Sequence, residues 1–281
     1  MNRSERWMIA RSERPAPLLE ALASHLDVSR KQAKRFLDAR QVFVNQQRVW
    51  MARHTVKAGD HVEVMGALRP TTPQALAVLR EQADWLVINK PAGLLSNGPD
   101  SAEEQLRALR KEPELEAVHR LDRDTSGCLL FSRRPAARPA LVELFEDKAI
   151  HKTYAALVQG RFTPHQVRID KALNGLSAST DFRVLMANAR ASLVEARPLT
   201  GRTHQIRLHL RELGYPLAGD RVYATGVVED KELRRLPRQM LHASELVWRN
   251  PEGGPVAIKA PWPDDFQRAV LSEDTCDLGG V

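Results

Sequence analysis

The chain has 281 residues, of which 43% are hydrophobic and 27% are charged, and it carries a formal net charge of +7. This length can bury a full core and predicts one large domain with a small one, or two domains of moderate size. No segment approaches the roughly 18 apolar residues of a membrane-spanning helix, and the N-terminus lacks the apolar run of a signal peptide. The composition argues against an integral membrane protein, and we expect a soluble, cytoplasmic protein with no membrane partner.

The positive charge is concentrated at the N-terminal end. Residues 1–70 contain 13 Lys and Arg against 7 Asp and Glu, a net +6 of the whole chain's +7. Such a basic segment favours polyanionic partners such as RNA, although it can also serve solubility alone.

Cys128 and Cys276 lie far apart in the sequence, which indicates a reducing compartment without a disulfide framework. No Cys and His spacing typical of a metal site is present, and we expect no metal.

The N-terminal part predicts a small α/β domain. Residues 1–14 are polar and are expected to be loosely ordered. Four leucines at helical spacing, Leu18, Leu19, Leu22 and Leu26, predict one apolar helix stripe. A second helix is expected at residues 30–39, and short alternating strands at residues 42–45 and 61–64.

The second predicted helix would present a basic face. Its exposed residues would be Arg30, Lys31, Lys34 and Arg35. The simpler interpretation is a solvated helix face that binds nothing. After it, the Pro- and Thr-containing stretch at residues 68–73 predicts a linker, so we place the domain boundary between residues 70 and 71.

Beyond the linker, helical and strand patterns follow one another. Strands are expected at residues 75–79, 85–89, 128–131, 152–158, 182–185 and 191–196. Helices are expected at residues 102–110, 138–145 and 206–213, the first of them capped by Ser101.

One stretch, HRLDRDTSG at residues 119–127, has the composition of an active-site loop. It places Asp122 between Arg120 and Arg123, and neighbouring guanidinium groups favour the ionised form of a carboxylate. An ionised carboxylate suits nucleophilic attack better than general acid catalysis. Thr125 and Ser126 can turn the backbone and donate hydrogen bonds. Taken alone, however, such a loop is more often a surface ion-pair turn.

The surrounding motifs favour an active-site loop over a surface ion-pair turn. HRLDRDTSG resembles the signature of the RluA-type pseudouridine synthases, in which the Asp after Arg-Leu is catalytic. Five further segments resemble this family in the same order: DWLVINKPAGL at 84–94, KTYAALVQG at 152–160, LTGRTHQIRLH at 199–209, GYPLAGDRVYA at 214–224 and LHASEL at 241–246. The resemblance implies an RNA-modifying isomerase that converts uridine to pseudouridine without a cofactor, by flipping the target base out of the RNA.

The resemblance also assigns roles to residues. Asp122, Tyr154 and Arg207 would be catalytic: Tyr154 would lie against the uracil ring, and Arg207 would hold Asp122 ionised. The expected substrate-binding residues are Arg120, Thr125, Arg202, His204, Gln205 and Leu241. Of these, Arg120 would occupy the space vacated by the base, and Leu241 would form an apolar wall. One departure from the family pattern is the segment Leu95-Ser96-Asn97, where the family has an apolar residue, His and Pro.

These inferences combine into one expected architecture. Residues 1–70, with a core at about 15–66, resemble the S-four RNA-binding domain, and residues 71–281 would be the catalytic domain. The implied fold class is α+β, with a mixed, largely antiparallel sheet around a central cleft. The expected partner is ribosomal or transfer RNA, and the expected state is a monomer. Two alternatives stay open, a non-catalytic RNA-binding or ribosome-assembly factor and a uracil-releasing glycosidase.

Overall fold

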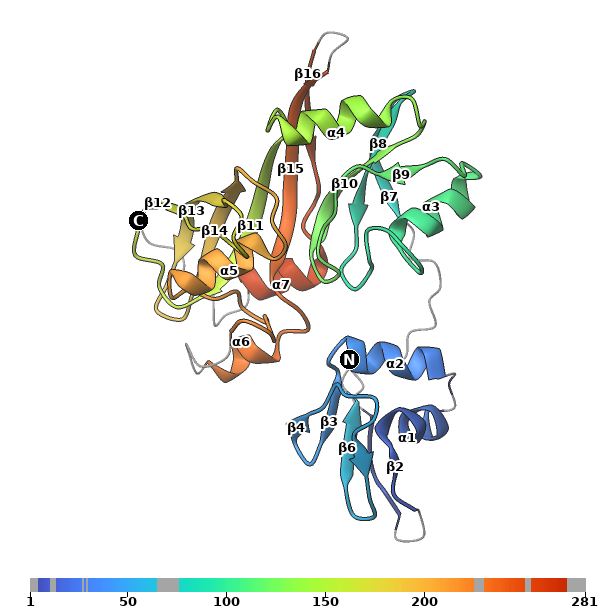
Figure 1. Cartoon of the computed structure of the whole chain (residues 1–281). Coiled ribbons are helices and arrows are strands. Elements are labelled where there is room, and N and C mark those ends of the chain that lie inside the picture. Colours follow the sequence, from blue (N-terminus) through green and yellow to red (C-terminus); the bar gives the residue numbers. More distant parts are fainter. Residues whose placement is uncertain are drawn as a thin grey trace. The chain divides into compact units, whose positions relative to one another are not determined.

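The computed structural model describes residues 5–10, 14–26, 28, 30–64, 76–224, 230–250 and 254–271. The chain divides into two compact units, Met1–Thr72 and Pro73–Val281 (Figure 1). The predicted linker at residues 68–73 and the boundary between residues 70 and 71 lie outside the described residues. None of the described helices is both long and apolar enough to cross a membrane.

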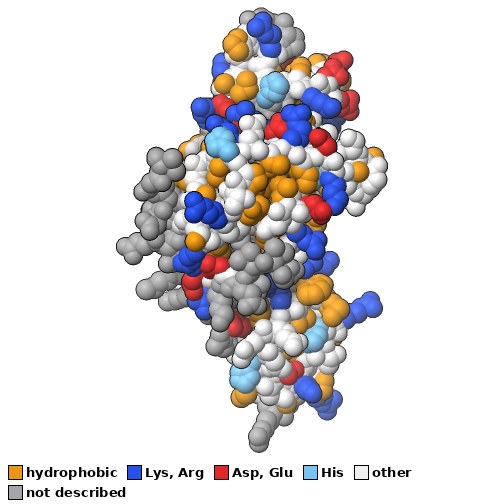
Figure 2. Space-filling model, turned by 90° about the vertical axis from the view of Figure 1, so that its left-hand side faces the viewer, with side chains coloured by type: hydrophobic (Ala, Val, Ile, Leu, Met, Phe, Trp, Pro, Cys, Tyr) orange, Lys and Arg blue, Asp and Glu red, His pale blue; other side chains and the backbone are white. Residues whose placement is uncertain are grey.

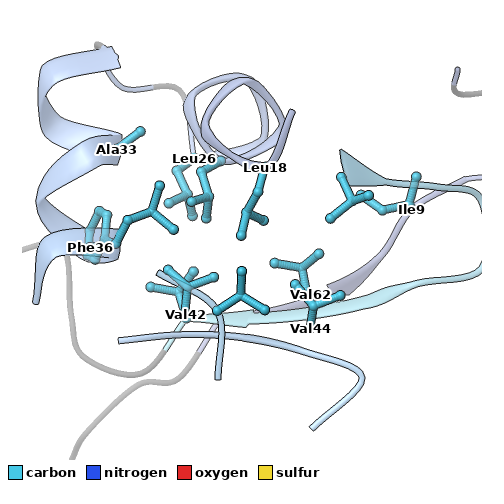
Figure 3. Packing of buried hydrophobic residues seen from close by; sticks show 13 residues of the cluster. Ile9, Leu18, Leu26, Ala33, Phe36, Val42, Val44 and Val62 are labelled. Carbon is cyan, nitrogen blue, oxygen red and sulfur yellow. The ribbon is translucent and has the colours of Figure 1, made fainter. Parts of the chain in front are cut away.

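In the first unit, two helices pack on a small sheet. The helices are α1 (Leu18–His25) and α2 (Arg30–Asp38). The strands lie in the order β1 (Glu5–Met8), β6 (His61–Val64), β3 (Val42–Val44) and β4 (Gln47–Arg48), and β2 (Ala16–Pro17) pairs separately with β5 (Thr55–Val56). Figure 3 shows the buried side chains of these elements meeting in one core. The predicted leucine stripe is confirmed, because Leu18, Leu22 and Leu26 are buried and Leu19 packs against them.

The beginning of the chain corrects one expectation. β1 pairs antiparallel with β6, and the Trp7 ring stacks on His25 with 3.9 Å between centroids. Ile9 is buried in the core of this unit. The prediction that residues 1–14 are loosely ordered is therefore wrong for residues 5–10. The alternation of Trp7 and Ile9 places both side chains on the same face of an extended chain, against the core.

The second unit is built on one ten-stranded sheet. The strands lie in the order β12 (Gln166–Asp170), β13 (Ser179–Ala187), β14 (Ala191–Pro198), β11 (His151–Gln159), β15 (Leu241–Asn250), β10 (Ser126–Ser132), β8 (Trp85–Lys90) and β7 (Ala77–Glu81). In addition, β16 (Gly254–Lys259) pairs with β15, and β9 (Glu116–Ala117) pairs with β10. All of these pairs are antiparallel except β10 with β15, which is parallel.

The second unit also contains helices, which are interspersed with the strands along the chain. Those described are α3 (Ala102–Arg110), α4 (Arg138–Glu146), α5 (Gln205–Glu212), α6 (Lys231–Arg235) and α7 (Asp264–Leu271). The mixed, largely antiparallel sheet with its helices confirms the predicted α+β class. The Ser101 cap is also confirmed, because its hydroxyl accepts a hydrogen bond from the Glu104 amide at 3.2 Å.

Strand β10 lies at the centre of the core. All seven of its residues are buried. Leu129 and Phe131 belong to one apolar cluster together with Leu121, whereas Cys128 and Leu130 belong to another. Because both faces of β10 are covered, the prediction of a buried strand at residues 128–131 is confirmed. The loop before this rigid strand carries Asp122.

Candidate active site

The Asp122 carboxylate receives its neighbours from distant parts of the chain. Arg207 Nη1 on α5 donates to Asp122 Oδ2 at 3.2 Å, and Gln239 Nε2 lies 3.5 Å from the same oxygen. The His204 Nε2 atom is 3.8 Å from the other carboxylate oxygen, Oδ1. The guanidinium group that pairs with Asp122 is therefore that of Arg207, not those of its sequence neighbours. The Arg123 Nε atom instead donates to the carbonyl of Gly93 at 3.1 Å.

Arg207 is itself held by a second carboxylate. Its Nε and Nη2 atoms donate to the two oxygens of Asp220 at 2.7 and 3.0 Å, and its guanidinium carbon lies 4.8 Å from the centre of the Tyr223 ring. Burial disfavours the charge, yet the hydrogen bonds and charge of Asp220, together with Asp122, raise the pKa of Arg207 above its ordinary value. Arg207 is thus a fixed cation shared by two carboxylates.

Tyr154 on β11 adds a neutral aromatic ring to the site. Burial, reinforced by the negative charge of Asp122, raises the pKa of the Tyr154 hydroxyl above its ordinary value. Within the described part of the chain, this hydroxyl has no hydrogen-bond partner. Tyr154 can therefore offer both a ring face and a free hydroxyl to a bound ligand.

The backbone beside Asp122 is fixed by polar side chains from other segments. The Ser96 hydroxyl donates to the carbonyl of Leu121 at 3.0 Å and accepts from its amide at 2.9 Å. The Thr125 amide donates to the Asp122 carbonyl at 3.0 Å, and the Thr125 hydroxyl accepts from Gln239 Nε2 at 2.9 Å. The family's usual residues are absent at Leu95-Ser96-Asn97, yet Ser96 supplies a direct restraint on the Asp122 loop.

A buried lysine, Lys90, donates hydrogen bonds to the backbone of the Asp122 loop and of the turn after β8. Lys90 is fully buried, and its Nζ donates to the carbonyls of Pro91, Leu94 and Arg123 at 2.9, 2.7 and 3.0 Å. Burial lowers the pKa of Lys90 to about 7, and the nearby charge of Asp124 opposes that shift. The KPAG turn after β8 is therefore tied to the loop that carries Asp122.

His204 occupies an unusual backbone position just before α5. Its φ of 55° lies in the left-handed region, which is sparsely populated by residues other than glycine. The Tyr223 hydroxyl lies 2.8 Å from His204 Nδ1, and burial lowers the pKa of His204. The neutral tautomer with its hydrogen on Nε2 would accept from the Tyr223 hydroxyl at Nδ1 and direct that hydrogen toward Asp122.

A single cavity of about 500 Å³ joins these groups. This volume is typical of pockets that enclose a small ligand. The structure brings together around it every residue predicted for the catalytic domain: Arg120, Asp122, Thr125, Tyr154, Arg202, His204, Gln205, Arg207 and Leu241. Of these, Arg120 is exposed and makes no side-chain hydrogen bond or ion pair with the described residues. It remains available to a ligand.

Two of the predicted binding residues are engaged within the protein. The Gln205 amide donates to the Ser179 carbonyl and the Thr180 hydroxyl, and its oxygen accepts from the Thr200 hydroxyl and the Arg202 amide. The Arg202 Nε atom donates to the Ser177 carbonyl at 3.0 Å. Both residues thus shape the loop before α5, and their contact with substrate stays a prediction.

The four predicted basic residues of the N-terminal unit lie on α2. Arg30 is exposed and pairs with Glu20, Lys34 is exposed, and Arg35 is half-buried. The side chain of Lys31 lies outside what the structure describes.

Sequence reasoning missed several residues that hold the site: Lys90, Ser96, Asp220, Tyr223 and Gln239. Asp220 and Tyr223 fall in the GYPLAGDRVYA segment. The resemblance of this segment to the family is the sequence signal for Asp220 and Tyr223, but it assigns neither residue a role.

Comparison with known proteins identifies the family of this chain. Residues 84–212 match the RNA pseudouridylate synthase family. The chain is 34% identical to ribosomal large subunit pseudouridine synthase C of Escherichia coli O157:H7 over 279 residues, which cover 84% of this chain and 86% of that protein. It is also 34% identical to ribosomal large subunit pseudouridine synthase D of Xanthomonas campestris pv. campestris, with 79% of each chain covered.

A solved structure is similar as well. The protein titled human RNA Pseudouridylate Synthase Domain Containing 1 matches with a TM-score of 0.59 and 28% identity, covering 70% of this chain and 87% of that one. Sequence relatives, fold and the residues around Asp122 lead to one conclusion: this chain belongs to the RNA pseudouridylate synthase family and is an RNA pseudouridine synthase.

Proposed function

We propose that this protein converts uridine to pseudouridine in ribosomal large-subunit RNA, with Asp122 as the catalytic group. The observation that carries the assignment is the contact of Asp122 with the buried Arg207 at a cavity that also contains Tyr154. The substrate class follows the names of the relatives, which are ribosomal large subunit pseudouridine synthases.

The reaction exchanges one bond of the uracil ring for another. The bond between N1 of uracil and C1′ of the ribose breaks, the ring turns, and C5 forms a bond with C1′. The hydrogen on C5 leaves as a proton and N1, which keeps the electron pair of the broken bond, takes up a proton, so the step balances without any oxidant or reductant. Asp122 can attack C1′, attack the ring, or stabilise an elimination intermediate, and all three routes need its negative charge.

The neighbouring residues take roles that fit their surroundings. Arg207 holds the Asp122 carboxylate in position through its hydrogen bond, and Arg207 is itself fixed by Asp220 on its other side. Tyr154 packs against the uracil ring, a contact worth roughly 1–3 kcal/mol. The exposed Arg120 fills the space left by the flipped base, and Leu241 closes the pocket with an apolar wall.

The first prediction concerns Asp122→Asn. The amide cannot act as a nucleophile, so we expect release of hydrogen from C5 of labelled RNA to fall by about a thousandfold or more. Affinity for the RNA should stay within about threefold, because the substitution leaves the cationic residues of the cavity in place. The measurement is single-turnover release of tritium from RNA labelled at C5 of uracil.

The matched control for this substitution is Asp170→Asn, which changes an exposed carboxylate on β12. It should react at the rate of the unchanged protein. Undiminished release of tritium by the Asp122→Asn variant would show that Asp122 is not the catalytic group. Free uracil among the products would point to a glycosidase instead.

We also infer that the N-terminal unit is an S-four-like RNA-binding domain. The two helices on a small sheet and the exposed Arg30 and Lys34 of α2 support this inference. Many Lys and Arg side chains also lie on the face of the protein in Figure 2. Contacts of this kind with phosphates position a protein on RNA without reading its sequence. We further propose that the protein is a monomer. We also propose that it acts in the cytoplasm, because its proposed substrate is ribosomal RNA.

A further inference from the structure

Lys152 extends the active-site cavity beyond the place of the uracil ring. It lies two residues before Tyr154 on β11, so both side chains project to the same face of the strand, roughly 7 Å apart along it. Lys152 lines the cavity together with Phe145 and Lys148 from the end of α4 and the turn after it. This part of the cavity has no role in the reaction as described above.

The ammonium group of Lys152 has no acidic partner in the part of the chain that the structure describes. Its Nζ lies 3.4 Å from the carbonyl oxygen of Thr200 and 6.0 Å from the centre of the Phe145 ring. No carboxylate among the described residues lies within the 4 Å of an ion pair. The side chain of Lys152 is half-buried, and this burial lowers the pKa of its ammonium group below its ordinary value. A partly desolvated ammonium without a counter-ion is stabilised when an anion binds.

The lack of a side chain at Gly201 leaves space beside this group. A Cβ atom at position 201 would lie 4.0 Å from Lys152 Nζ, in van der Waals contact with it. Glycine therefore places no side-chain atom against this side of the ammonium.

The charges around the cavity favour an anion here. Its cations are Arg120, Lys148, Lys152, Arg202 and Arg207, whereas its lining acids are Asp122 and Glu146. Arg207 is already matched by Asp220 and Asp122. The remaining cations outnumber the one remaining acid, Glu146. The anions that an RNA substrate carries next to its base are backbone phosphates.

We propose that Lys152 binds a backbone phosphate adjacent to the flipped uridine, forming a phosphate subsite beside Tyr154. This inference rests on the proposed function, because it takes the substrate to be RNA. The subsite would add to the affinity for the nucleotide while Tyr154 contacts its base.

The test replaces Lys152 with Met, which keeps most of the side-chain volume and removes the charge. The probe is an unmodified transcript of large-subunit ribosomal RNA, and its affinity is measured over a series of salt concentrations. We expect binding to weaken roughly tenfold at low salt. The slope of log affinity against log salt should become shallower by about one, the value for one lost phosphate contact. The single-turnover rate at saturating RNA should stay within about threefold.

Two further variants make the outcome decisive. Lys152→Arg should restore most of the affinity and the salt slope, because a guanidinium also binds phosphate. Lys259→Met removes an exposed lysine on β16 and should change neither quantity. Thermal unfolding of each variant checks that the fold is kept.

Several results would overturn the proposal. A salt slope equal to that of the unchanged protein would mean that Lys152 contacts no phosphate. A fall in the saturating rate with an unchanged slope would assign Lys152 to the chemistry or to the packing of β11. Failure of the proposed function is seen separately: the unchanged protein would then form no pseudouridine in this transcript, while the salt slopes still report phosphate contacts.

Discussion

At the scale of single residues, a buried network behind the Asp122 loop holds one histidine neutral. His242 is fully buried, with its Nδ1 atom 2.9 Å from the Ser126 hydroxyl and its Nε2 atom 3.2 Å from the Ala260 carbonyl. Ser126 also accepts a hydrogen bond from Arg238 Nη2 at 3.2 Å, so its own hydrogen points at His242. The ring therefore donates from Nε2 and accepts at Nδ1. Burial lowers the pKa of His242 to about 4.

This depressed pKa predicts a loss of stability in acid. The unfolded chain binds a proton at His242 near pH 6.5, whereas the folded chain binds it only near pH 4. The contribution is thus complete above pH 6.5 and is lost as the pH falls toward 4. Between pH 6.5 and 4.5 we expect His242 to account for roughly 2 kcal/mol of the decline in unfolding free energy. Urea unfolding at several pH values measures it.

The variant His242→Gln isolates this contribution. It should be less stable than the unchanged protein at pH 7 but should lose about 2 kcal/mol less on acidification. Burial also lowers the pKa of His119, to about 3, so part of the acid sensitivity remains in both proteins. Identical pH dependence in the two proteins would refute the assignment.

Sequence and structure differ in what they reveal about the site. The motifs pointed to Asp122, Tyr154 and Arg207, because each stands in a segment with a recognisable pattern. Asp220 and Gln239 were not predicted, since an Asp or Gln becomes a site residue only when folding brings it beside Arg207 or Asp122. Asp220 is 13 positions from Arg207 and Gln239 is 117 positions from Asp122, and neither contact leaves a signal within one short segment.

At the scale of elements, the parallel contact between β10 and β15 stands out in an otherwise antiparallel sheet. Ser126 pairs with His242 and Gly127 with Ala243. Gly127 has a φ of 114°, and a Cβ atom there would lie 2.2 Å from the Ala243 carbonyl oxygen. Only glycine allows the backbones to approach in this way at the strand start that follows the Asp122 loop.

The substitution Gly127→Ala should therefore be strongly destabilising. Both the positive φ and the clash with backbone atoms must be relieved, and we expect a loss of roughly 3–5 kcal/mol. The comparison is Gly254→Ala on β16, where a Cβ would meet nothing within 4 Å. That change should alter stability by less than about 1 kcal/mol. Thermal unfolding measures both, and equal melting temperatures would contradict the argument.

Local patterns predicted many elements but not β15, the strand between β11 and β10. The boundaries of α3 were predicted correctly, because an N-cap and an apolar stripe are signals within one short segment. Strand β15 was not predicted as a strand: His242, Ser244 and Glu245 interrupt its apolar residues. These polar groups are tolerated because neighbours from distant segments satisfy them, as Ser126 and Ala260 do for His242.

At the scale of the whole molecule, the two units carry unequal charge. Residues 1–70 hold +6 of the net +7, whereas every predicted catalytic residue lies in the second unit. RNA affinity depends steeply on the number of phosphates that a protein neutralises. The two units should therefore contribute differently to binding and to chemistry.

Removal of residues 1–72 tests this division. We expect affinity for the ribosomal transcript to fall at least about tenfold near 0.1 M salt, with a shallower salt dependence. The single-turnover rate at saturating RNA should change by less than about threefold. Melting of the truncated protein verifies that its own core persists. Equal affinity at every salt concentration would argue against an RNA-binding N-terminal unit.

The position of β15 in the sheet has a consequence for synthesis of the protein. β15 lies between β11 and β10, so it joins the strands on the β12 side to those on the β7 side. It spans Leu241–Asn250, however, far along the chain from its neighbour β10 (Ser126–Ser132). A nascent polypeptide that has not yet reached this segment has two half-sheets with unpaired edges and an Asp122 loop without its flanking partner. The sheet can join its two halves only after β15 has been synthesised, and the open edges need protection until then.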